Sequence, residues 1–127
     1  MLVRNGTIRV QWCHGAPGII TSLGSILDEE LAVAGDELTW RAGPVAKGAS
    51  LCHGTAGNGY AFLTLFERTG NERWLERARR FASHALAQVG QARAHHGKGR
   101  YSLWTGDVGT ALFVADCIDG GGTLPLP

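Results

Sequence analysis

LCHGTAGNGYAFL, residues Leu51–Leu63, is the stretch from which the fold can be predicted, because a shorter version of it stands upstream. The upstream copy is QWCHGAPGII, Gln11–Ile20. Both copies place a Cys-His-Gly triplet before a second glycine and an apolar run. A third Gly-x-x-Gly, Gly106–Gly109, lacks the triplet. Because glycine lets the backbone turn sharply and pack closely, we interpret each Gly-x-x-Gly as a joint at which a helix begins.

The segments between these joints predict pairs of helices. The apolar runs that follow the joints, IITSLGSIL, GYAFLTLFE and TALFVADCI, are typical of buried inner helices. Apolar residues then recur every three or four positions over 71–90, which predicts an amphipathic outer helix capped by Asn71 and stopped by Gly90. In the first unit, both helices must fit with a break near Asp28 or Gly35. Repeats of this length are typical of two-helix units, and we predict an all-α fold.

Composition limits the possible functions. The chain has 127 residues and a formal net charge of +1, which favours a single domain and gives no reason to expect a nucleic-acid partner. No run approaches the ~20 apolar residues of a transmembrane segment, and MLVRNGTIRV lacks the apolar core of a secretory signal. Three cysteines cannot all be paired in disulfides within the chain, and disulfides are rare in the cytosol. We therefore expect a cytoplasmic protein. The glycine-rich tail, residues 119–127, is expected to be disordered.

The two Cys-His-Gly triplets raise a chemical question. If the inner helices begin on one rim of a helical array, then Cys13, His14, Cys52 and His53 converge there. Thiolate and imidazole are ligands that suit Zn²⁺, and helix N-termini favour thiolate over thiol. Buried cysteine is also a common core residue, which is our interpretation of Cys117. The residues alone therefore leave both packing and metal binding open for the repeated pair.

Three motifs resemble a known family. WCHGAPG, KGASLCHGTAGNGYAFL and YSLWTGDVGTALFVAD are similar, in this order, to the last three motifs of the lanthionine synthetase C-like (LanC-like) proteins, from about Gln11 to Asp116. The residues of the two Cys-containing motifs are more similar to those of the eukaryotic-type branch. The resemblance implies a partial α/α toroid, about the last three helical hairpins of a seven-hairpin α/α barrel. We accordingly interpret residues 1–127 as the C-terminal fragment of such a domain, from a split, truncated or partial gene.

The resemblance also implies a reaction. One zinc ion would be bound by Cys13, Cys52 and His53, with His14 as a supporting neighbour. The zinc would activate a thiol, from glutathione or a peptide cysteine, for conjugate addition to dehydroalanine or dehydrobutyrine in a peptide or protein, which forms a thioether. Lys47 matches a lysine near the glutathione or phosphate site of the eukaryotic-type branch; it is equally consistent with an ordinary loop lysine.

The family's proposed acid–base His and Asp lie in upstream repeats that this chain lacks. The sequence thus leaves open whether the chain is an enzyme by itself, and it suggests that an upstream chain could complete the toroid. One alternative is a catalytically incomplete module that binds zinc and glutathione. The other is a helical scaffold, or gene remnant, with incidental cysteines.

Overall fold

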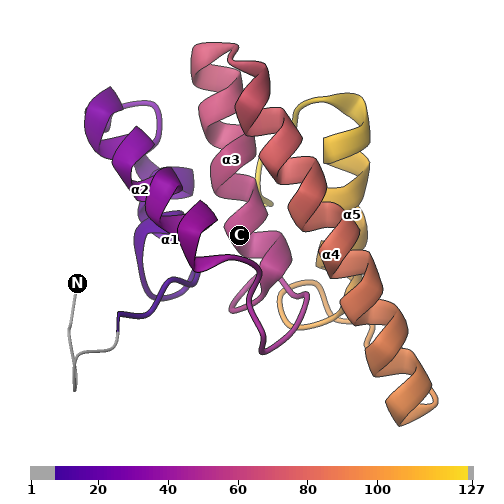
Figure 1. The fold of residues 1–127 in the computed structure, drawn as a ribbon. Helices are drawn as coiled ribbons and strands as arrows, with labels where there is room; N and C mark the ends of the chain where they lie inside the picture. The colour runs from indigo at the N-terminus through magenta and orange to yellow at the C-terminus, as the bar shows by residue number, and fades with distance from the viewer. Residues whose placement is uncertain (1–7, 126–127) are drawn as a thin grey trace.

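The computed structural model describes residues 8–125, and the regular structure in this range is helical. The five helices are α1 (Ala16–Leu23), α2 (Glu29–Ala42), α3 (Thr55–Thr69), α4 (Glu72–His96) and α5 (Asp107–Asp119). In the described part of the chain, β-structure is limited to one isolated bridge between Gln11 and His14. Helix α3 lies at the centre and contacts each of the other four helices (Figure 1). The predicted all-α class is confirmed.

The three inner helices begin where the glycine joints predict. Gly15, Gly54 and Gly106 are the N-cap residues of α1, α3 and α5. The second glycine of each joint has a different role, because a methyl group there would overlap a backbone carbonyl oxygen of the preceding loop. The pairs are Gly18 with Trp12, Gly57 with Leu51 and Gly109 with Leu103. The first turn of each inner helix therefore packs directly on the loop that leads into it.

The break in the first unit lies near Asp28, one of the two predicted places. Asp28 caps α2 by accepting a hydrogen bond from the Leu31 amide at 3.1 Å. Gly35, the other candidate, lies inside α2, where its missing side chain leaves room for Ile20 of α1. Packing of α1 against α2 thus explains this glycine better than a helix end does.

Helix α4 begins at the predicted cap but runs past the predicted stop. The Asn71 side chain accepts from the Arg73 amide at 3.1 Å. Gly90 has open space around it, so nothing ends the helix there, and α4 continues to Gly97, which has the left-handed φ of 72°. The predicted stop at Gly90 is wrong. His95 and His96 lie in the last turn of α4.

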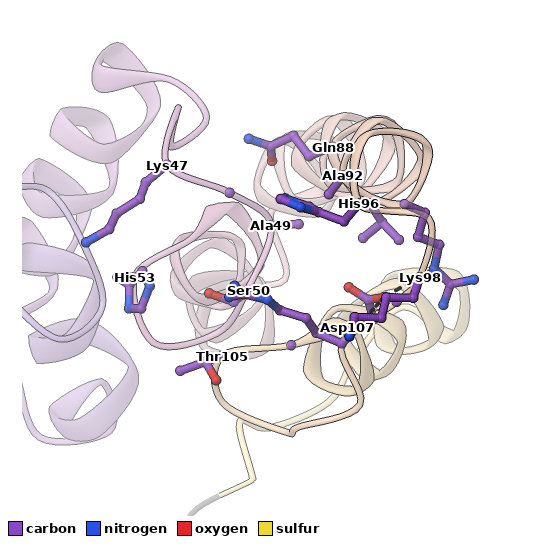
Figure 2. A pocket seen from close by; sticks show the side chains of 16 residues that line it. Lys47, Ala49, Ser50, His53, Gln88, Ala92, His96, Lys98, Thr105 and Asp107 are labelled. Atoms are coloured by element: carbon purple, nitrogen blue, oxygen red, sulfur yellow. Dashed lines mark hydrogen bonds and ion pairs between the residues drawn. The ribbon is translucent and has the colours of Figure 1, made fainter.

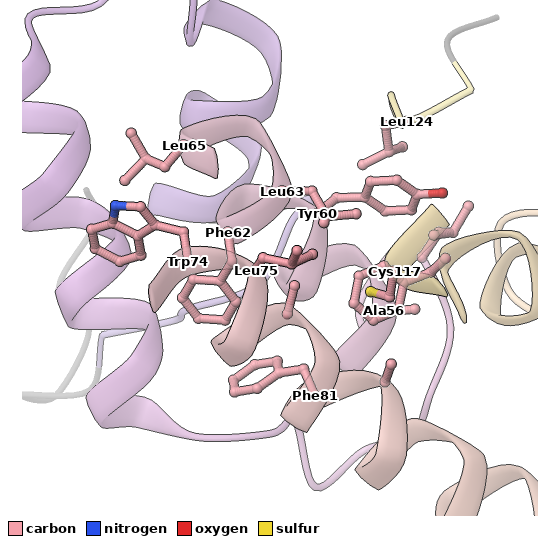
Figure 3. Packing of buried hydrophobic residues seen from close by; sticks show 14 of the residues in the cluster. Ala56, Tyr60, Phe62, Leu63, Leu65, Trp74, Leu75, Phe81, Cys117 and Leu124 are labelled. Atoms are coloured by element: carbon pink, nitrogen blue, oxygen red, sulfur yellow. The ribbon is translucent and has the colours of Figure 1, made fainter. Parts of the chain in front are cut away.

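The core joins α3 and α4 through aromatic side chains (Figure 3). The Phe62 ring lies 4.9 Å from the Phe81 ring and 6.4 Å from the Trp74 ring. After α5 ends at Asp119, the chain turns back and buries Leu124, which is 7% exposed, against this core. Disorder was expected for residues 119–127; of these, 126 and 127 lie outside the described residues.

No helix in the described range 8–125 combines the length and the apolar character that a membrane crossing requires.

Candidate functional site

The loops that precede α1, α3 and α5 meet at one end of the helices and form a rim (Figure 1). We call residues 11–15, 50–54 and 102–106 the loop rim. Backbone hydrogen bonds join the three loops in series: the Cys13 amide donates to the Cys52 carbonyl at 3.0 Å, and the Cys52 amide donates to the Trp104 carbonyl at 2.9 Å. These three residues occupy equivalent positions before the three joints. The repeat therefore brings matching residues side by side, as the sequence predicts.

The two repeated cysteines lie together on the loop rim. Cys13 is exposed and Cys52 is half-buried, and both thiols are free. Burial raises the pKa of the Cys52 thiol, the charge of Cys13 and a hydrogen bond with Cys13 raise it further, and Lys47 acts in the opposite direction. The backbone hydrogen bond from Cys13 to Cys52 makes the two residues neighbours, although they come from different repeats.

Cys117 differs from this pair in its surroundings. Its side chain is 2% exposed within α5, and burial raises the pKa of its thiol to about 12. A thiol in such surroundings remains protonated and unreactive at neutral pH. The interpretation of Cys117 as a core residue is confirmed.

The histidines of the two triplets do not join the thiol pair. His14 is exposed, and His53 is half-buried on the wall of a neighbouring cavity. Within residues 8–125, no three His, Cys, Asp or Glu side chains are arranged so that they could hold a metal ion. The structure thus assembles Cys13 with Cys52, and a ligand set that also includes His53 stays a prediction.

The cavity that His53 lines is basic. It has a volume of about 400 Å³ and lies between the loop rim, the loop before α3 and the C-terminal end of α4 (Figure 2). Its cationic lining residues are Lys47, Arg93, Lys98 and Arg100, and its carboxylate is Asp107. Asp107 accepts hydrogen bonds from Arg93 Nε and from the Arg100 amide, both at 3.2 Å. Because the cations outnumber this acid, the cavity favours an anionic ligand.

The loop that carries Lys47 is held in place by α3 and α4. Thr55 Oγ1 accepts from the Val45 amide at 3.1 Å and donates to Gln88 Oε1 at 2.7 Å. Gln88 Nε2 in turn donates to the Val45 carbonyl at 2.7 Å. These bonds fix the base of the loop, so Lys47 extends from an anchored segment near His53 (Figure 2).

Sequence reasoning missed the contribution of Arg93, Lys98 and Arg100 to this cavity. For Lys98 and Arg100 the signal was present in the short basic run HHGKGR, but its meaning depends on how far α4 extends. Only when α4 reaches His96 do these residues face the loop that carries Lys47.

Comparisons with known proteins agree with the motifs on the loop rim. The family model described as lanthionine synthetase C-like protein matches residues 2–124. The chain is 37% identical over 116 residues to Glutathione S-transferase LANCL1 of Danio rerio, and 33% identical over 123 residues to LanC-like protein GCL1 of Arabidopsis thaliana. Each match covers 86% of this chain but only 28% of the relative's length.

Proposed function

Because the chain belongs to the lanthionine synthetase C-like family, we propose that it is the zinc- and thiol-binding part of a protein that forms thioethers. The observation that carries this proposal is the backbone hydrogen bond that joins Cys13 to Cys52, from separate repeats, next to His53 on the wall of a basic cavity. The chain spans 28% of the relatives' length, so the whole reaction is part of the proposal.

The side chains on the loop rim fit zinc by their chemistry. Two thiols and one imidazole, from Cys13, Cys52 and His53, would supply three zinc ligands, the number typical of catalytic zinc sites. A backbone hydrogen bond joins Cys13 to Cys52, and His53 directly follows Cys52. Bound zinc would lower the pKa of a substrate thiol and stabilise its thiolate. His14, exposed beside Cys13, fits a supporting role rather than that of a ligand.

The basic cavity supports glutathione as the thiol substrate. Glutathione carries two carboxylates, and the cavity offers Lys47, Arg93 and Arg100 to bind anions. A relative named Glutathione S-transferase favours glutathione over a peptide cysteine. The acceptor in this proposal is a dehydroalanine or dehydrobutyrine residue of a peptide or protein. Its β-carbon forms a bond with sulfur while the carbon–carbon double bond breaks, the thiol loses its proton, and the α-carbon gains one.

The proton transfers of this reaction call for an upstream chain. Large apolar side chains on α1 and in the connection to α2 stay exposed, among them Ile19, Leu23 and Ile26. Such a surface is suited to packing against a preceding helical hairpin. We propose that this hairpin belongs to the part of the protein that also supplies the acid–base residues.

Three free thiols are in keeping with a cytoplasmic location, which is likewise a proposal.

Metal analysis of purified protein tests the first step. We expect about one zinc per chain in the unmodified protein and in Cys117→Ala, because Cys117 is buried away from the loop rim. Cys52→Ala should lose the metal and keep its helical circular dichroism. Less than about a tenth of an equivalent in the unmodified protein would rule out the zinc site.

The chain's short span relative to its relatives supports a second candidate, a module that binds zinc and glutathione without catalysis. Incubation with glutathione and a dehydroalanine peptide separates the two functions. Adduct formation above the zinc-free background supports catalysis. Glutathione binding without adduct supports the module.

A further inference from the structure

Asn58 connects the helix that follows Cys52 to the segment that leads to Cys13. It lies in the first turns of α3 and is completely buried. Its side-chain Nδ2 donates a hydrogen bond to the Val10 carbonyl at 2.8 Å. Val10 immediately precedes the Gln11–His14 bridge, whose turn contains Cys13. A single side chain of α3 thus reaches the other cysteine's loop.

The burial of Asn58 is costly if its only role is to stabilise the fold. Its Oδ1 atom is buried and has no hydrogen-bond partner among the described residues. The orientation of the amide is settled by its partner, because only the NH₂ group can donate to a carbonyl. An unsatisfied buried polar atom destabilises the fold, whereas an apolar side chain of the same shape avoids that cost. Asparagine at this position therefore calls for an explanation beyond packing.

Two hydrogen bonds hold the turn from both sides. Before the turn, Asn58 holds Val10; within it, the Cys13 amide donates to the Cys52 carbonyl at 3.0 Å. The turn itself is closed by hydrogen bonds in both directions between Gln11 and His14. Removal of the first bond leaves the turn held by one backbone hydrogen bond to the Cys52 loop and by the contacts of the Trp12 ring with Thr21 and Trp104.

We propose that Asn58 is a positioning residue that holds the Cys13 turn so that the Cys13 and Cys52 thiols meet. Helix α3 then determines the position of both thiols: Cys52 through the loop at its N-terminus, and Cys13 through Asn58. Only the use of the two thiols as zinc ligands rests on the proposed function; their position does not. The approach of the two thiols can be measured without metal.

The test is the rate at which a short bifunctional bimane reagent bridges Cys13 and Cys52 in metal-free protein. Asn58→Leu is the main variant, because leucine has nearly the same shape and removes the orphaned oxygen. Val10 is only half-buried, so we expect folding to survive the loss of this bond. Thr39→Val is the matched control. It removes the hydroxyl of another fully buried side chain, whose hydrogen bond to the Gly35 carbonyl lies within α2.

We expect Asn58→Leu to slow bridging roughly fivefold, the effect of losing one hydrogen bond. Thr39→Val should bridge at the unmodified rate, and both variants should keep their helical circular dichroism. Unchanged bridging in Asn58→Leu would overturn the proposal. Loss of helical structure in both Asn58→Leu and the smaller Asn58→Ala would also overturn it, because Asn58 would then support the whole fold. If the unmodified protein binds no zinc, the proposed metal site is refuted. Slower bridging in Asn58→Leu would still support this inference.

Discussion

Replacement of Asp36 by asparagine should remove a pH-dependent weakness of the fold. Asp36 is fully buried in α2, and neither of its carboxylate oxygens has a hydrogen-bond partner among the described residues. Burial raises the pKa of Asp36 to about 8; attraction by Arg77 lowers it less strongly, and Glu37 raises it. Arg77 is already engaged, since its Nη1 lies 3.1 Å from Glu37 Oε1 and its guanidinium lies 4.8 Å from the Trp40 ring centre.

The direction of the effect follows from proton binding. Folded Asp36 remains neutral until about pH 8, whereas in the unfolded chain its carboxyl has the ordinary aspartate pKa of 3.8 and is ionised at neutral pH. Between these values unfolding releases a proton, so rising pH favours the unfolded state. Each pH unit in this window lowers the free energy of unfolding by about 1.4 kcal/mol, which amounts to about 3 kcal/mol from pH 5 to pH 7. Below the unfolded pKa the effect vanishes.

Urea unfolding followed by circular dichroism measures this contribution. Asp36→Asn cannot ionise, so the difference in unfolding free energy between the variant and the unmodified protein should grow by about 3 kcal/mol from pH 5 to pH 7. Glu30→Gln, which removes an exposed acid from the same helix, should leave the pH slope unchanged. A difference that stays flat between Asp36→Asn and the unmodified protein would refute the reasoning, because Asp36 would then be ionised in both states.

Two further pairs of variants test the packing and the cavity. Gly57→Ala should lower the free energy of unfolding by about 2 kcal/mol or more, because its methyl group meets a backbone carbonyl, whereas Gly90→Ala, in open space within α4, should raise it by about 0.5 to 1 kcal/mol. Equal effects of the two in urea unfolding would contradict this account of the joints. Lys47→Ala should weaken glutathione binding about threefold to fivefold in calorimetry, and Arg41→Ala, outside the cavity, should not. Unchanged binding by the Lys47 variant would remove Lys47 from the proposed site.

The joints could be predicted from sequence because their requirements are local. Each joint has one glycine where its helix begins close to the preceding loop and a second where the first turn presses on a loop carbonyl, and this pair recurs around Gly15, Gly54 and Gly106. The end of α4 could not be predicted in this way. Gly90 weakens a helix by only about 1 kcal/mol relative to alanine, and the glutamine, alanine and arginine residues around it favour continuation.

The candidate site shows the same division. Equivalent positions in successive repeats become neighbours, so the meeting of Cys13 and Cys52 follows from the repeat itself. The basic cavity depends on the length of α4, which continues to His96 and so places Arg93 opposite the loop of Lys47. No short sequence motif predicts where this helix ends. The position of the His53 ring depends on its surroundings rather than on its place in the triplet.

The backbone hydrogen bonds from Cys13 to Cys52 and from Cys52 to Trp104 indicate how many repeats are needed to position the two thiols. Each step joins two successive joints, and Asn58 adds a side-chain bond across the first step. The thiol pair therefore depends on two adjacent repeats and the helix between them, not on closure of a ring. In the proposed reaction, residues that protonate the acceptor's α-carbon would have to face the thiols from other helices. It follows that metal binding and thiol binding should survive in this chain alone, while the rate of thioether formation should rise when upstream helices are supplied as a second chain. An equal rate with and without that second chain would contradict this division.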